Sequence, residues 1–142
     1  MTNHFDSAAD AEDAYYDAID ECDTEKMMSV WEDSSEVGCL LPMQPMRNGR
    51  EAIEALWKPM LDPDMGVDIM VNHLQWIESG DIAIHVIEER ITLRGDGGGG
   101  TQPPIYAVNT FRRSGDGWRL LLHINSPAPP PPGAMSPGMM PG

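Results

Sequence analysis

The fold of this chain is decided by a stretch near its C-terminal end, VNTFRRSGDGWRLLLHINS (residues 108–126). The turn-forming letters SGDG (114–117) predict two antiparallel strands joined by a short connection. Apolar side chains stand at both alternate positions of the last strand: Trp118, Leu120, Leu122 and Ile124 on one side and Leu121 on the other. A strand with one face in water should alternate. We therefore expect both faces of the sheet to be covered, one by helices and the other by a second copy of the chain.

Further strands precede this hairpin. The stretches 67–78, 82–94 and 105–113 carry apolar residues with a period near two. Ser79-Gly80-Asp81 predicts a hairpin turn between the first two, and GDGGGG (95–100) is read as a flexible connection rather than a phosphate cradle, because no helix or lysine follows it. Long strands joined in this way form an antiparallel meander.

Three amphipathic helices come before the meander. Apolar residues recur at spacings of three and four over 8–22, after a capping serine, Ser7. A short helix follows Asp23 or Thr24, and another begins at Asn48, with Glu51 completing a capping box. Between them, 37–41 is read as a short strand. This order predicts an α+β fold in which three N-terminal helices pack on one face of a strongly curved, mainly antiparallel sheet and enclose an apolar pocket.

The chain has 142 residues, which suits one domain over 1–126, followed by a tail rich in proline, glycine and methionine over 127–142. The formal net charge of -14 opposes binding to nucleic acid or to an anionic membrane surface. Two cysteines outside any metal-binding spacing favour reduced thiols, and the first residues carry no apolar leader. We therefore expect a cytoplasmic protein that contacts neither nucleic acid nor membrane.

Three segments together resemble a known family. DAYYDAIDECDTEKMMSVWEDSSEVGCLLP (13–42), RNGREAIEALWKPML (47–61) and the hairpin of 108–126 stand in the order typical of SnoaL-like domains, which belong to the nuclear transport factor 2-like superfamily. The likeness extends roughly over 8–126. It implies a cone-shaped α+β barrel with an internal pocket, commonly dimeric through the outer face of its sheet.

The same resemblance suggests catalytic residues. In the steroid-isomerase pattern, Tyr15 matches a tyrosine of the first helix and Asn109 falls at the place of a strand acid, but no carboxylate stands at the base position near 39–41. SnoaL-like relatives often carry histidines before a serine, and here His123 and Ser126 remain of that cluster. We predict His123, Asn109 and Tyr15 as catalytic, with a structural, hydrogen-bonded histidine as the alternative for His123.

Pocket walls are predicted from the helix faces and one strand. Trp31, Trp57 and Met27 point inward on their helices, and His85 lies on a strand; plain core packing is the alternative for the tryptophans. The strand histidines show no ligand spacing, so we expect no metal and no cofactor. The run 88–90 (Glu-Glu-Arg) is read as a solvated strand edge or an interface pair.

Two functions are consistent with these residues. The first is a small-molecule-binding domain with an apolar pocket, as an isomerase, dehydratase or cyclase of SnoaL-like type whose substrate is unknown. The second is a non-catalytic binding or dimeric assembly module. The missing carboxylate near 39–41 favours the second, and the pocket histidine favours the first. Whether Tyr15, Asn109 and His123 meet at one cavity discriminates between them.

Overall fold

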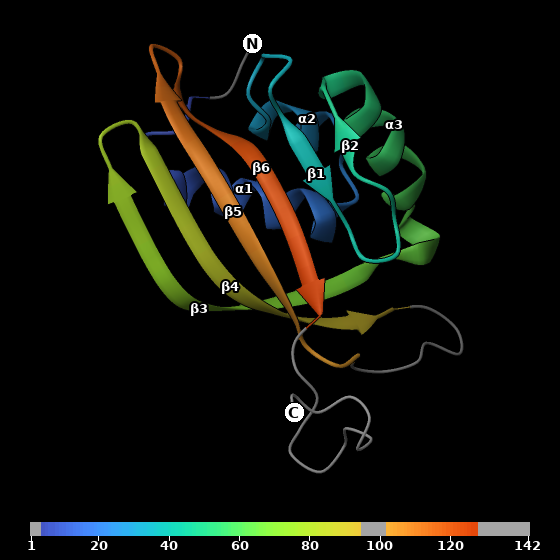
Figure 1. Ribbon diagram of the computed structural model, residues 1–142. Coiled ribbons are helices and arrows are strands. Elements are labelled where there is room, and N and C mark those ends of the chain that lie inside the picture. Colours follow the sequence, from blue (N-terminus) through green and yellow to red (C-terminus); the bar gives the residue numbers. More distant parts are fainter. Residues whose placement is uncertain (1–3, 95–101, 128–142) are drawn as a thin grey trace.

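One curved sheet carries the helices on a single side (Figure 1). The computed structural model describes residues 4–94 and 102–127. The elements are α1 (Ala8–Glu21), α2 (Thr24–Val30), β1 (Gly38–Leu40), β2 (Arg47–Asn48), α3 (Arg50–Met60), the 3-10 helix η1 (Pro63–Met65), β3 (Val67–Ser79), β4 (Ile82–Leu93), β5 (Ile105–Ser114) and β6 (Gly117–Pro127). The glycine-rich connection and the tail beyond Pro127 lie outside the described residues. The α+β class is confirmed.

The strands lie in the order β2-β1-β6-β5-β4-β3. Neighbours are antiparallel except β1 and β6, which run parallel. In Figure 1 the faces of β3 to β6 lie toward the viewer with no helix over them, while α1 crosses behind. The core therefore fills the concave side between the helices and the sheet. Its largest fully buried side chains include Trp31, Tyr15, Phe111, Met27 and Ile53.

Local chemistry starts and ends the helices largely as predicted. The Ser7 hydroxyl accepts a hydrogen bond from the Asp10 amide at 3.0 Å, which caps α1, and Asp23 caps α2. The capping box at Asn48 was wrong, because that residue pairs with Gly38 in the edge strand β2. Gly49, with a φ of 88°, is the N-cap of α3 instead.

A β-bulge in β6 corrects the predicted face pattern. Thr110 pairs with Leu122 and Phe111 pairs with Leu120, so Leu121 is an extra residue. Trp118 and Leu120 therefore face the helices, whereas Leu122 and Ile124 face outward. The expectation that these four share one side was wrong. The extra residue turns His123 inward, where it is 1 % exposed.

A second bulge lies in the edge strand β3. His73 pairs with Ile87 and Gln75 with Val86, which leaves Leu74 as the extra residue. His73 and Trp76, three residues apart, thus both lie on the concave side. No helix among the described residues is long and apolar enough to cross a membrane.

Candidate functional site

A small cavity opens between α1, α3 and the sheet. Its volume is about 180 Å³, below the range usual for drug-sized ligands, so it suits a small molecule. Most of its wall is apolar and includes Ile19, Trp57, Ile69 and Ile91. The polar lining groups include Tyr15, Glu89, His123 and Asn125. The cavity is therefore mainly apolar, with a few polar side chains in its wall.

Glu89 is the buried carboxylate of this cavity. It is 3 % exposed, because Ala83, His85, Ile87 and Glu89 alternate onto the concave face of β4. The Tyr16 hydroxyl donates to Oε2 at 2.7 Å, and Asn125 Nδ2 donates to Oε1 at 2.8 Å. No Lys or Arg within residues 4–94 and 102–127 forms an ion pair with it. The expected solvated edge or interface pair was therefore wrong for Glu89, while Glu88 and Arg90 do pair with each other, at 3.3 Å.

Five side chains close a circuit of hydrogen bonds around this carboxylate. His123 Nδ1 lies 2.5 Å from Asn109 Oδ1, and His123 Nε2 lies 2.9 Å from Asn125 Oδ1. Asn109 Nδ2 donates to the Tyr16 hydroxyl at 3.2 Å, and Tyr16 in turn donates to Glu89. Because the circuit is closed, a change in the protonation state of one side chain alters the hydrogen bonds of its neighbours and, through them, those of the other members.

His123 stands between two acceptors. The NH₂ groups of both asparagines are directed at other oxygens, so each presents its carbonyl oxygen to the ring. A neutral imidazole has one N–H and satisfies only one of them. Burial lowers the pKa of His123, and the opposing influence of Glu89 and Asn125 does not cancel it. If the neutral His123 ring takes up a proton, both of its N–H groups can donate, one to Asn109 Oδ1 and one to Asn125 Oδ1.

A second polar cluster adjoins the first through Asn109. Glu12 of α1 is 3 % exposed, and its two oxygens lie 2.6 Å from His73 Nε2 and 2.9 Å from His85 Nδ1. Asn109 Nδ2 also donates to Oε2 at 3.0 Å. Burial by itself would raise the pKa of Glu12, but the hydrogen bonds from His85, His73 and Asn109 outweigh it and lower that pKa.

The predicted site residues fall into three groups. Tyr15, His123 and Trp57 line the cavity, and Asn109 lies directly behind His123. His85 is fully buried against Glu12, outside the cavity lining. Met27 is a core side chain, and Trp31 borders a different hollow.

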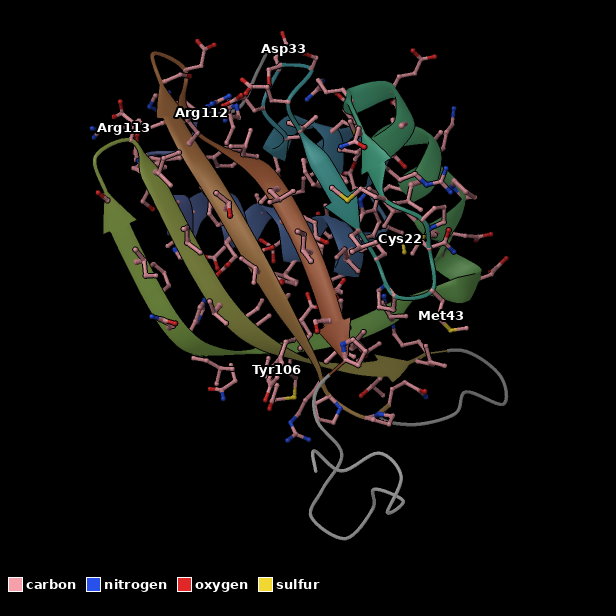
Figure 2. The ribbon with its side chains drawn as sticks, viewed as in Figure 1. Cys22, Asp33, Met43, Tyr106, Arg112 and Arg113 are labelled. Atoms are coloured by element: carbon pink, nitrogen blue, oxygen red, sulfur yellow. The ribbon has the colours of Figure 1, made fainter. Side chains whose placement is uncertain are left out.

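That second hollow is a wide, polar groove of about 880 Å³. Arg112 in its wall donates to Glu32 and to the neighbouring Glu36, and this guanidinium lowers the pKa of Glu32. Figure 2 shows Arg112 and Asp33, which both line the groove, at one end of the molecule and Tyr106 at the opposite end of β5. The groove and the cavity are therefore separate features.

Sequence reasoning missed five residues of the two polar clusters: Glu12, Tyr16, His73, Glu89 and Asn125. Glu89 shares its strand parity with His85, and Asn125 shares that of His123, so alternation could have found both. Glu12 stands among several acidic residues of its helix, yet it lies one turn before Tyr16 at the border of the apolar stripe. Whether residues at the border of the apolar stripe are buried depends on how wide the sheet is on which α1 packs.

The fold and the cavity define a class of protein: a small α+β domain in which helices and a bent sheet enclose a pocket with polar groups in its wall. The chain belongs to the SnoaL-like domain family, which matches residues 9–130. Two solved structures of cystatin-like fold proteins, 21 % and 14 % identical to this chain, share its fold. Among proteins of curated function, none matches this sequence.

Two solved structures are similar in sequence as well as in shape. A putative calcium/calmodulin-dependent protein kinase type II association domain from Thiobacillus denitrificans is 33 % identical, with a TM-score of 0.81 over 89 % of this chain and 99 % of that one. A putative dehydratase of the NTF2-like family from Streptomyces avermitilis is 26 % identical, with a TM-score of 0.75 over 84 % and 92 %. A ketosteroid isomerase-like protein from Erwinia carotovora atroseptica, 18 % identical over 84 % and 92 % with a TM-score of 0.69, shares the fold.

Proposed function

We propose that this domain binds a small, largely apolar carbonyl or hydroxy compound in the cavity and that Glu89 moves a proton on it. The observation that carries the proposal is a buried carboxylate that borders an apolar cavity and has no cationic partner within the described residues. Such a carboxylate suits general-base removal of a proton next to a carbonyl group, the step shared by isomerisation and dehydration. The 26 % identical neighbour described as a putative dehydratase supports this reaction class.

The other polar groups have roles that follow from their contacts. Tyr16 and Asn125 each donate to one oxygen of Glu89, which leaves each oxygen further lone pairs. The Tyr15 hydroxyl lines the cavity with no hydrogen-bond partner among the described residues, and burial raises its pKa well above 10, so it remains protonated and can donate to a substrate oxygen. Glu89 itself holds the proton that it removes and returns it to the substrate or to solvent, while Asn125 links Glu89 to His123 Nε2 and Asn109 positions the His123 ring.

A matched pair of variants tests the role of Glu89. Small ketones, aldehydes and β-hydroxy acids are screened by thermal shift, and compounds that stabilise the protein are incubated with it in D₂O. NMR then follows exchange of the proton next to the carbonyl group. We expect exchange with the wild type and with Glu88→Gln, whose side chain lies on the outer face, but not with Glu89→Gln. Exchange that survives in Glu89→Gln, or no stabilisation by any compound, would contradict the proposal.

The outer sheet face favours a second property, a homodimer. Among the side chains that point away from the helices, five are apolar and only half-buried: Ile84, Val86, Val108, Leu122 and Ile124. We propose that two copies pack through this face, because a contiguous apolar surface of this kind marks an interface. The 33 % identical neighbour is described as an association domain, which is the assembly function of the non-catalytic alternative.

Light scattering after size-exclusion chromatography tests the dimer. We expect Ile84→Arg to convert the dimer to a monomer and Glu54→Arg, on the exposed side of α3, to leave it intact. A wild-type monomer, or an Ile84→Arg dimer, would contradict the proposed interface. A dimer that fails to exchange protons with any tested compound would favour the assembly module over the enzyme.

A further inference from the structure

A cluster outside the cavity carries ligands for a metal ion. We propose that Glu12, His73 and His85 form a binding site for a divalent transition-metal ion of the zinc type. Two imidazoles and one carboxylate are a ligand set that suits zinc and its neighbours in the first transition row. The proposal departs from the expectation of no metal, which rested on sequence spacing: the two histidines stand on different strands, and only the folded sheet and the bulge at Leu74 bring them together.

The distances permit a shared ion. One nitrogen of each histidine and a carboxylate oxygen of Glu12 all lie within 4.8 Å of one another. Zinc bonds of about 2.1 Å in tetrahedral geometry separate ligand atoms by about 3.4 Å. The contacts of 2.6 and 2.9 Å from the two oxygens of Glu12 to the histidines must therefore open by less than about 1 Å, and ligand atoms as far as 4.8 Å apart must close by about 1.4 Å. The side chain of His73 is 43 % exposed and can shift to allow both changes.

The surroundings fix the other two ligands. Asn109 donates to Glu12 Oε2 and so orients the carboxylate, as outer-shell partners do at metal sites. The Trp76 indole stacks on the His85 ring with centroids 3.6 Å apart, and Phe111 lies against the same ring at 5.0 Å. No Lys or Arg forms an ion pair with Glu12 within the described part of the chain, where its hydrogen-bond partners are the two imidazoles and Asn109. A cation bound by the three ligands would place a positive charge beside this buried carboxylate.

One group limits the affinity. His85 Nε2 is buried and has no partner among the described residues. A metal ion on Nδ1 requires the ring proton to sit on Nε2, where no acceptor awaits it. We therefore expect weaker binding than at closed structural zinc sites. Three protein ligands also leave at least one coordination position for water, reached from solvent beside His73.

The site is independent of the proposed reaction. Glu12, His73 and His85 do not line the cavity, and among the described residues their hydrogen bonds reach it only through Asn109. Loss of the ion would leave Glu89 and its partners in place, and failure of the Glu89 experiment would leave the metal ligands in place.

Zinc titration of the full chain, stripped with chelator, tests the proposal by calorimetry. We expect one equivalent to bind, and both His73→Gln and Glu12→Gln to weaken binding by more than about tenfold, the smallest effect usual even for outer-shell partners. His4→Gln is the matched control, because His4 pairs with Asp6 at the surface at 3.1 Å, and it should bind as the wild type does. His73 is half-exposed, so its variant should fold even if Glu12→Gln does not.

Two spectra complete the test. Cobalt in place of zinc should give visible bands without thiolate charge transfer, which excludes Cys22 and Cys39 as the ligands. Nitrogen NMR should show the His85 proton move from Nδ1 to Nε2 when zinc binds. No binding to the wild type, equal binding to His73→Gln, or a thiolate band would each overturn the proposal.

Discussion

The replacement Tyr16→Phe tests how much the buried circuit contributes to stability, and the adjacent Tyr15 supplies its control. The Tyr16 hydroxyl makes two hydrogen bonds, one to the Glu89 carboxylate at 2.7 Å and one from Asn109 Nδ2 at 3.2 Å. The Tyr15 hydroxyl, on the same helix, makes none with the described residues. The two variants remove the same atom, so the difference between them isolates the circuit.

The expected magnitude follows from the contacts. A hydrogen bond to a charged group contributes about 1.5–3 kcal/mol, and a neutral bond about 1 kcal/mol. Asn109 Nδ2 keeps Glu12 as an acceptor in the variant, so its loss is small, whereas Glu89 keeps only Asn125. We expect Tyr16→Phe to lower the free energy of unfolding by about 2–4 kcal/mol and Tyr15→Phe by less than about 1 kcal/mol.

Urea unfolding, followed by circular dichroism, measures both changes. With an m-value near ~2 kcal/mol/M, the midpoint should fall by about 1–2 M for Tyr16→Phe and by under about 0.5 M for Tyr15→Phe. Equal midpoints for the two variants would refute the reasoning, because they would show that Glu89 gains nothing from its buried donor. A large change in the m-value would instead indicate a disturbed unfolded state.

Three further predictions concern other parts of the molecule. Burial lowers the pKa of His123 below 6.5, so as the pH drops the unfolded chain takes up a proton at this residue before the folded chain does. The free energy of unfolding should therefore decrease below about pH 6.5. We expect the urea midpoints at about pH 7.5 and 5.5 to differ more for the wild type than for His123→Gln. An alanine inserted between Leu122 and His123 shifts the alternation of the rest of β6 by one residue and turns His123 outward, so it should cost more than about 3 kcal/mol of unfolding free energy, whereas an alanine inserted beside Gly115 in the turn should cost less. Gly117→Ala, where a Cβ would lie 2.7 Å from the Phe5 carbonyl oxygen at φ +91°, should lower the melting temperature more than Gly49→Ala, which has φ +88° but open space around it.

The sequence predicted the sheet well because alternation and turn residues act locally. The turns at 79–81 and 114–117, the cap at Ser7 and the order of helices and strands are all confirmed. It failed at the first residue of α3, because sheet pairing of Asn48 with Gly38 outweighed a local capping pattern. The sequence also could not predict β2, because a strand of two residues has no period to detect.

Residue identity and spacing by themselves predicted the fold class, the helix-covered face and the cavity residue Trp57, and the resemblance to SnoaL-like domains added Tyr15 and His123. Only the tertiary structure decided which polar side chains meet. Two bulges, at Leu74 and Leu121, each shift the alternation of a strand by one residue and bring His73 and His123 to the concave face. A bulge depends on pairing with a neighbouring strand, and the pairing depends on the whole sheet, so no pattern within one strand reveals it.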